Sequence, residues 1–246
     1  MGDPVVWFEL GAGDPEPLVS FYRELLGWDM RPIDGGYTLV DTRGGAGVNG
    51  GIGRSRSGDP WATFYVGVRD LQATIDRAEA MGAKTVMPIT EVPEMVTFAM
   101  IADTDGLVLG LLELDIPQEG AAPGPSDGDG ASVDWFEVLG SDAQRTQRFY
   151  AELFGWQVAT GDFPGYGLVD TQADRGIRGG LGGGGENRWA TVYASVPDAE
   201  RTLARAEELG GRRVYGPMAV GEQMRTGALR DPAGNVFGVY QGAPGA

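Results

Sequence analysis

The side chains of this sequence that could do chemistry include two glutamates, Glu9 and Glu137, each placed two residues after a tryptophan. The surrounding stretches read VVWFEL and VDWFEV. Alternation at a period of two predicts β-strands, so Trp7 shares a face with Glu9, and Trp135 shares a face with Glu137. A carboxylate beside a tryptophan in a cavity could act as a general base or as the counter-ion of a cationic ligand. Glu9 and Glu137 are therefore candidate catalytic residues; alternatively, they hydrogen-bond the backbone or the other copy of the repeated domain.

Two further stretches, WATFYVGV and WATVYASV, place aromatic residues and a threonine at alternate positions. Aromatic side chains on one face of a strand suit stacking on a planar organic ligand, and their alternative role is to fill the core. Tyr240 stands where the first copy has Leu112, so the two copies are not equivalent. The full set of candidate ligand-binding residues is Trp7, Glu9, Trp61, Thr63, Tyr65, Trp135, Glu137, Trp189, Thr191, Tyr193 and Tyr240.

Histidine and cysteine are absent from the chain. A Ser-His-Asp or Cys-His arrangement and a zinc site are therefore excluded, and we expect no metal and no cofactor. Two segments, GAGVNG (45–50) and GLGGGG (180–185), match the GxGxxG pattern. Each runs toward a strand that begins with tryptophan instead of opening a helix, so neither predicts a nucleotide site. We expect these glycines to let a hairpin pass close to a ligand or to twist sharply.

The chain has 246 residues and a formal net charge of −16, and 42 of its residues are glycine. The negative charge argues against a nucleic-acid partner, whose phosphates carry the same sign. It is compatible with a cationic ligand or with a role in solubility alone. No apolar run approaches the ~18 residues of a membrane span, and no secretory leader opens the sequence. We expect a cytoplasmic monomer or homodimer whose partner is a small molecule, with no membrane partner.

The same pattern occurs twice along the chain, displaced by 128 residues, as in Trp7 and Trp135. Further on, RAEAMGA is echoed by RAEELGG, and DTDGLVLGL by DPAGNVFGV. A period this long is not that of a solenoid, so the sequence indicates a duplicated domain. We place the first module at 1–115, a linker rich in Pro, Gly, Ser and Asp at 116–131, and the second module at 132–246.

Each module reads as a strand, a helix, three strands, a second helix or turn, and a final strand. In the first module Asp14 and Pro15 predict the start of the first helix and Gly27 predicts its end. A second helix is predicted from Asp70 to Gly82, with a counterpart from Asp198 to Gly210. The apolar face of the first helix is Leu18, Phe21, Tyr22, Leu25 and Leu26.

A strand followed by D…FY…LGW, closed by DPxG leading into a strand, resembles the vicinal oxygen chelate superfamily. That superfamily includes glyoxalase I, bleomycin-resistance proteins, fosfomycin-resistance enzymes and extradiol dioxygenases. The resemblance covers the chain outside the linker, twice, and is greatest to the two-module actinobacterial glyoxalase-like branch. It implies an α+β fold of two tandem βαβββ modules related by a pseudo-twofold axis, with sheets curled around a small-molecule cavity.

The resemblance also implies three metal-ligand positions in each module. They correspond to Trp7, Thr63 and Gly110 in the first module, and to Trp135, Thr191 and Gly238 in the second. Tryptophan offers no lone pair to a metal, glycine has no side chain, and a neutral threonine alone is a poor ligand. The resemblance therefore implies a scaffold that has kept its fold and lost the metal site.

Three functions are compatible with these observations. The first is a metal-free protein that sequesters or carries a small aromatic or cationic compound, as bleomycin-resistance proteins do. The second is a lyase, isomerase or oxygenase-type enzyme that uses Glu9 or Glu137 as a base, or a metal held at other positions than those of the superfamily. The third is a secreted or surface interaction protein. The residues at the metal positions of both copies favour the first.

Overall fold

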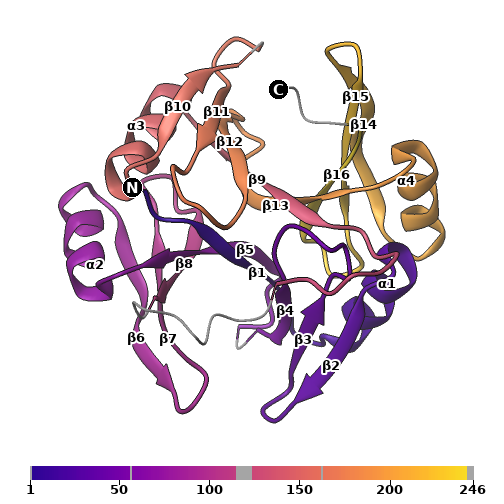
Figure 1. The fold of residues 1–246 in the computed structure, drawn as a ribbon, viewed down its shortest axis with the longest axis horizontal. Helices are drawn as coiled ribbons and strands as arrows, with labels where there is room; N and C mark the ends of the chain where they lie inside the picture. Colours follow the sequence, from indigo (N-terminus) through magenta and orange to yellow (C-terminus); the bar gives the residue numbers. More distant parts are fainter. Residues whose placement is uncertain (1, 56, 115–123, 162, 243–246) are drawn as a thin grey trace. The chain divides into compact units, whose positions relative to one another are not determined.

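A computed structural model describes residues 2–55, 57–114, 124–161 and 163–242 of the chain. The fold is α+β, and each module forms one eight-stranded sheet (Figure 1). The elements of the first module are β1 (Val5–Ala12), α1 (Glu16–Leu26), β2 (Asp29–Ile33), β3 (Tyr37–Asp41), β4 (Gly50–Arg54), β5 (Trp61–Val68), α2 (Leu71–Ala80), β6 (Lys84–Val92), β7 (Val96–Ala102) and β8 (Val108–Glu113). Those of the second are β9 (Val133–Gly140), α3 (Ala143–Phe154), β10 (Gln157–Thr160), β11 (Gly167–Asp170), β12 (Arg178–Gly183), β13 (Trp189–Ser195), α4 (Ala199–Glu208), β14 (Arg212–Val220), β15 (Met224–Arg230) and β16 (Val236–Gln241).

The two sheets have the same strand order, β2-β3-β4-β1-β5-β8-β7-β6 in the first module and β10-β11-β12-β9-β13-β16-β15-β14 in the second. The predicted tandem α+β organisation is confirmed, and each module holds the βαβββ order twice, since β1-α1-β2-β3-β4 is followed by β5-α2-β6-β7-β8. Each sheet has eight strands where the sequence pattern predicts five. Strands such as β6 and β14 escape prediction because each carries an interior proline and only half-buried or exposed side chains, without an alternating apolar pattern in the sequence.

Helix ends follow the predicted capping residues. The carboxylates of Asp70 and Asp198 each accept a hydrogen bond from a backbone N–H in the first turn, at 2.8 and 3.0 Å. Asp142, the counterpart of Asp14 in the second module, does the same at the start of α3, at 2.8 Å. Asp14 accepts the N–H of Glu16 at 3.4 Å, so α1 begins one residue later than predicted. Gly27 ends α1 in the left-handed conformation, with a φ of 71°, which a residue with a side chain adopts only with strain.

By packing, the chain forms two compact units that do not coincide with the modules. Unit 1 comprises residues 1–7, 63–122 and 135–190; unit 2 comprises residues 8–62, 123–134 and 191–246. Each unit therefore combines half of one module with the complementary half of the other. Helices α2 and α3 lie side by side in unit 1, and α1 and α4 lie side by side in unit 2 (Figure 1).

The core of unit 1 is a chain of aromatic rings. Phe136 packs against Phe64 and Trp156 at centroid distances of 4.9 and 5.0 Å, and Tyr150 stacks on Trp156 with an interplanar angle of 13°. The hydroxyl of Tyr150 donates to the carboxylate of Asp103 at 3.1 Å inside this core. A buried hydroxyl and a buried carboxyl each need such a partner, because leaving either unpaired is costly.

Unit 2 repeats this arrangement with the roles of the modules exchanged. Trp28 stacks on Tyr22 with an interplanar angle of 10° and contacts Phe8 and Phe237 at 5.2 and 5.8 Å. The Tyr22 hydroxyl donates to Asp231 at 3.1 Å. In each unit, the first helix of one module thus contacts a carboxylate that lies just before the last strand of the other module: α3 contacts Asp103, and α1 contacts Asp231.

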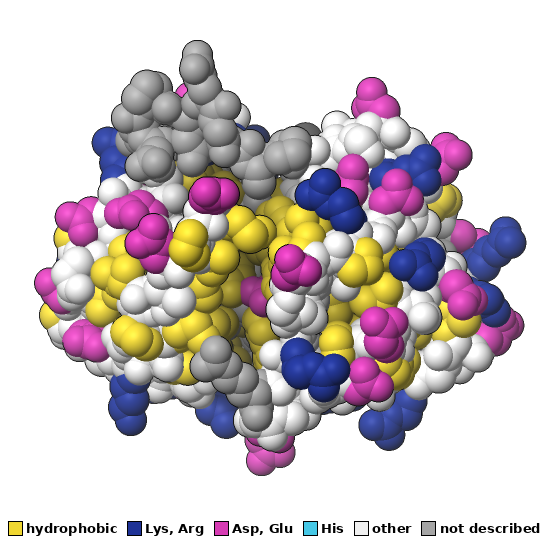
Figure 2. Space-filling view, turned by 90° about the horizontal axis from the view of Figure 1, so that it is seen from below, with side chains coloured by type: hydrophobic (Ala, Val, Ile, Leu, Met, Phe, Trp, Pro, Cys, Tyr) yellow, Lys and Arg dark blue, Asp and Glu magenta, His cyan; other side chains and the backbone are white. Residues whose placement is uncertain are grey.

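The described surface mixes charged and apolar side chains. Figure 2 shows acidic and basic side chains interspersed among hydrophobic ones on the face that it presents. The net negative charge is thus spread over this face and is not gathered in one patch there. Among the described helices, none is long and apolar enough to cross a membrane.

Candidate functional site

Glu137 lies on β9, and the strand alternates as the sequence predicts. Phe136 and Val138 are fully buried in the core of unit 1. Trp135 and Glu137 therefore point to the opposite face of β9. There Trp135 is paired with Arg178 and Glu137 with Gly180 on the parallel neighbour β12.

The carboxylate of Glu137 is held by two aromatic side chains. The hydroxyl of Tyr166 donates to Oε1 at 2.9 Å, and Nε1 of Trp189 donates to Oε2 at 2.8 Å. Glu137 itself is only 8% exposed, whereas Trp135, Tyr166 and Trp189 are half-buried. The result is a buried carboxylate with a fixed orientation, bordered by partly exposed aromatic rings.

Glycines on β12 make room for Tyr166. A Cβ atom on Gly180 would collide with the hydroxyl and ring of Tyr166, and one on Gly182 would lie 2.9 Å from the same ring. The segment GLGGGG thus lets a tyrosine lie flat on its neighbouring strand. Gly180 and Gly182 have this packing role, and the approach of these glycines to a ligand stays a prediction. Because the motif forms strand β12 and does not open a helix, it is not the dinucleotide-binding fingerprint.

Unit 2 holds the equivalent group of Glu9, Tyr37 and Trp61. Tyr37 covers Gly51, where a Cβ would meet its hydroxyl, and the Glu9 carboxylate and the Tyr37 ring both lie 3.3 Å from the Cβ position of Gly53. Trp61 lies directly over Gly11.

The two tryptophans are not equivalent, because the second module has Leu139 where the first has Gly11. A Cβ at Gly11 would collide with the indole of Trp61. The Leu139 side chain on β9 fills the place over which Trp61 lies in the first module, and Trp189 on β13 instead donates to Glu137. A single Gly-to-Leu difference thus gives the two copies different aromatic arrangements.

The residues at the metal positions implied by the superfamily do not fit a metal ion. The ring of Tyr65 occupies the space that a side chain at Gly110 would need, and Tyr193 does the same at Gly238. The Thr63 hydroxyl is directed at the carbonyl of Val108, to which it donates at 2.7 Å. Thr191 makes the same kind of bond to Val236 at 2.6 Å. Within the described part of the chain, no cluster of three or more Asp, Glu, His or Cys residues could hold a metal.

A group of three tyrosines, Tyr193, Tyr215 and Tyr240, lies on strands β13, β14 and β16 of the second module, in unit 2. The hydroxyls of Tyr193 and Tyr215 are 3.0 Å apart, and Tyr240 donates to Asp134 at 2.8 Å. Burial, followed by the charge of Asp134, raises the pKa of Tyr240 well above its usual value. Burial also raises the pKa of Asp134.

The predicted site residues divide between the two units. Unit 1 brings Trp135, Glu137 and Trp189 together, and unit 2 contains Thr191, Tyr193 and Tyr240. The remaining predicted residues are divided in the same way, with Trp7, Thr63 and Tyr65 in unit 1 and Glu9 and Trp61 in unit 2.

Sequence reasoning missed Tyr166 as the hydrogen-bond partner of Glu137, and it missed Tyr37, which lies near Glu9. Their signal was present, because YTLVDT and YGLVDT recur at matching places just before the glycine-rich segments. Tyr215 was also missed, because it lies on β14, a strand that the sequence pattern did not predict.

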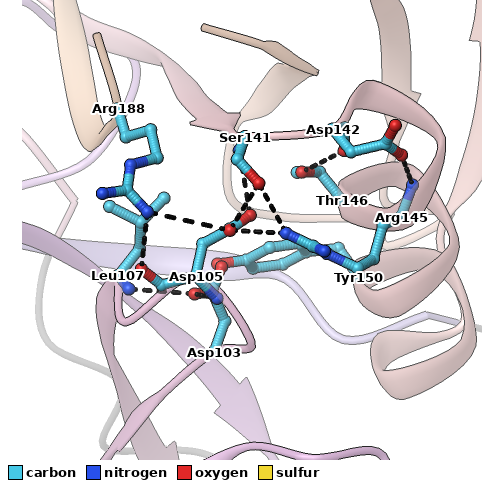
Figure 3. A network of polar contacts seen from close by, with 9 residues as sticks. All are labelled: Asp103, Asp105, Leu107, Ser141, Asp142, Arg145, Thr146, Tyr150 and Arg188. Atoms are coloured by element: carbon cyan, nitrogen blue, oxygen red, sulfur yellow. Dashed lines mark hydrogen bonds and ion pairs between the residues drawn. The ribbon is translucent and has the colours of Figure 1, made fainter. Parts of the chain in front are cut away.

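A further polar cluster, centred on Asp105, is structural (Figure 3). This carboxylate accepts hydrogen bonds from the backbone and hydroxyl of Ser141 at 3.0 and 2.8 Å and pairs with Arg145 at 2.6 Å. Burial acts to raise the pKa of Asp105, but the bonds from Ser141 and the charge of Arg145 outweigh it and lower the pKa. The cluster fixes the turn between β7 and β8 to the start of α3. The second module has Ala233 at the matching position and so lacks this cluster.

Two open hollows of about 500 Å³ each also lie in unit 2. One is lined by polar residues that include Asp198, Glu200 and Arg225, and the other by the end of α1 and the segment before β9. None of the predicted site residues lines either hollow.

The glyoxalase-like domain model matches this chain twice, over residues 7–111 and 136–240. The chain belongs to the glyoxalase-like domain family. The two matched ranges correspond to the two eight-stranded sheets.

Relatives of this family cover the chain almost end to end. A putative glyoxylase CFP32 of Mycobacterium tuberculosis is 27% identical over 97% of this chain and 94% of its own length. The anthracycline biosynthesis protein DauV of a Streptomyces species is 29% identical over 96% of this chain and 92% of its own length.

Solved structures share the fold at low identity. The Mn(II)-bound glyoxalase from Novosphingobium aromaticivorans has a TM-score of 0.69 at 15% identity, covering 97% of this chain and 83% of that one. The 2,3-dioxygenase LapB from Pseudomonas has a TM-score of 0.68 at 17% identity, covering 99% and 94%.

Proposed function

We propose that this protein binds a planar organic molecule bearing a positive or hydrogen-bond-donating group, without the metal of the wider superfamily. The observation that carries the proposal is the carboxylate of Glu137, fixed between Tyr166 and Trp189 at 2.9 and 2.8 Å. A carboxylate held in one orientation loses little freedom when it takes a further donor, which favours binding.

The surroundings of Glu137 suit an aromatic ligand. Trp135, Tyr166 and Trp189 are half-buried, so part of each ring is open to contact. Stacked aromatic pairs contribute about 0.5–1.5 kcal/mol beyond the area they bury.

The relatives are consistent with a fused-ring ligand. Two of them are named anthracycline biosynthesis proteins, at 29% and 28% identity. Others are named putative glyoxylases. Because tryptophan, threonine and a tyrosine-covered glycine stand at the metal positions, we infer binding rather than metal-dependent lyase chemistry for this chain.

A charge-matched titration tests this proposal. The probes are 9-aminoacridine, a planar cation, and 9-anthracenecarboxylate, a planar anion of similar size, with binding followed by calorimetry. We expect the cation to bind more tightly, and Glu137→Gln to weaken it by about 10- to 100-fold, as loss of a charged hydrogen bond predicts.

We expect the Glu137→Gln variant to keep the fold. Its carbonyl can accept from Trp189 and its amide can donate to the Tyr166 hydroxyl. Glu152→Gln, an exposed site on α3, removes the same charge and should leave the affinity unchanged. Equal affinities for the two probes, or equal losses in both variants, would count against the proposal.

A further inference from the structure

The second halves of the two modules present matching faces with different side chains. In the first module, the register places Tyr65 beside Gly110, Gly110 opposite Met100, and Phe98 opposite Leu112. Met87 lies opposite Met100. These residues therefore share one side of the sheet in unit 1, which we call the β5–β8 face.

The corresponding side in unit 2, the β13–β16 face, follows the same register. Tyr193 is beside Gly238, and Thr226 lies opposite Tyr240. Tyr215 lies opposite Ala228, and Met218 opposite Thr226.

The first of these faces is largely apolar. The rings of Tyr65 and Phe98 meet edge to face at 6.2 Å. Met87, Phe98 and Leu112 are all half-buried and offer only carbon and sulfur atoms to a neighbour. Such a surface suits an unsubstituted ring or alkyl group, because a polar group placed there would lose its hydrogen bonds to water.

The second face carries hydroxyls at the same three places. Tyr215 replaces Met87, Thr226 replaces Phe98, and Tyr240 replaces Leu112. The hydroxyl of Tyr215 meets that of Tyr193 at 3.0 Å. Tyr215 and Thr226 remain half-buried, and the Thr226 hydroxyl lies 3.5 Å from the carbonyl of Val239. Tyr240 is buried, and its hydroxyl donates to Asp134 at 2.8 Å.

Hydroxyl groups at an apolar face change what the face selects. A site that hydrogen-bonds a ligand hydroxyl discriminates strongly against the analogue that lacks it, because its own polar groups then lose a partner. An apolar site, by contrast, disfavours the hydroxylated ligand only weakly relative to its apolar analogue. Three polar replacements on one face are therefore a change of specificity as well as of packing.

We propose that the two copies have diverged into binding faces of different chemistry: the β13–β16 face takes a hydroxylated aromatic ring, and the β5–β8 face takes an apolar ring. This inference rests on the proposed function only in taking the chain to be a binder of aromatic molecules. It assigns Tyr215, Thr226 and Tyr240 as the residues that set specificity in the second copy.

Methionine methyl groups report on the two faces separately. Met87 and Met100 lie on the β5–β8 face, and Met218 lies on the β13–β16 face. Protein labelled with ¹³C at the methionine methyls would be titrated with 2-naphthol and with 2-methylnaphthalene, which differ only in OH against CH₃. We expect 2-naphthol to shift the Met218 signal, and 2-methylnaphthalene to shift those of Met87 and Met100.

Removal of one hydroxyl sharpens the test. Tyr215→Phe should weaken 2-naphthol binding by about three- to tenfold, the loss of one hydrogen bond, and should leave 2-methylnaphthalene unaffected. Tyr65→Phe, on the other face, is the matched control and should leave the Met218 response unchanged. The reciprocal Met87→Tyr should gain a response to 2-naphthol on the β5–β8 face.

The outcomes separate the two proposals. If both probes bind but shift the same methionines, or if Tyr215→Phe leaves 2-naphthol affinity unchanged, the divergence of the faces is wrong while aromatic binding stands. If neither probe nor 9-aminoacridine binds at millimolar concentration, both proposals fail.

Discussion

Tyr150, on the helix of the second module, donates its hydroxyl to Asp103 of the first module across 3.1 Å in the core of unit 1. Tyr22 and Asp231 form the same pair in unit 2, with the modules exchanged. Each module therefore supplies a tyrosine whose carboxylate partner belongs to the other. The duplication is thus tied together by reciprocal bonds, in addition to the chain that joins the two copies.

The first prediction is that neither module folds cooperatively without the other. Residues 1–115 expressed alone should lack a cooperative thermal transition, because Tyr22 and Asp103 would both lose their buried partners and Trp28 would lose Phe237. Mixing 1–115 with 124–246 should restore near-ultraviolet circular dichroism. Cooperative unfolding of the isolated first module would contradict this interpretation.

The second prediction concerns single hydroxyls. Tyr150→Phe should lower the free energy of unfolding by about 1–2 kcal/mol, because a buried carboxyl group loses a hydrogen bond. Tyr22→Phe should cost a similar amount. Chemical denaturation measures both, and a change below about 0.3 kcal/mol in both variants would show that these pairs contribute little.

The third prediction is a pH dependence. The pKa of Asp105 is lowered, so its contribution to stability is present above its ordinary pKa of 3.8 and is lost as the pH falls through the lowered value. The Asp105→Asn variant should therefore be less stable than the natural protein at pH 6, by about 1–3 kcal/mol, and the difference should shrink toward pH 2–3. A difference that does not change with pH would mean that the charge of Asp105 is unimportant.

The contribution of Asp231 to stability should depend on pH in the opposite direction from that of Asp105. Burial raises its pKa above 3.8 despite hydrogen bonds from Asn235 and Tyr22. Its contribution to stability is therefore greatest below pH 3.8 and is lost as the pH rises through the raised value. An Asp231→Asn variant, compared over the same pH series, should lack this loss.

The fourth prediction tests the packing of Tyr166 on β12. Gly180→Ala should destabilise the protein by about 1–3 kcal/mol, because its Cβ collides with the Tyr166 ring. In the double variant with Tyr166→Ala, the added cost of Gly180→Ala should nearly vanish. If the two losses of stability were additive in this double-mutant cycle, the Tyr166 ring would not pack against Gly180.

The fold could be read from the sequence where local signals were strong. Capping aspartates, the apolar face of α1 and the duplicated motifs predicted the helices and the tandem modules. Strands without alternation, such as β6 and β14, could not be predicted from periodicity. The reciprocal Tyr–Asp pairs depend on which halves of the chain pack together, and a local pattern carries no such information.

The candidate site was predicted in part. Strand alternation correctly placed Trp135 and Glu137 on one face, away from Phe136. Tyr166 could not be assigned as a partner of Glu137, because its position depends on the pairing of β11 with β12 and on glycines that leave space for its ring.

The most direct test of the central claim is a crystal structure of the complex with 9-aminoacridine. We expect a nitrogen of the probe about 3 Å from an oxygen of Glu137, its ring against Trp135 or Trp189, and the Tyr166 and Trp189 hydrogen bonds retained. A probe bound elsewhere, with no contact to the Glu137 carboxylate, would contradict the account.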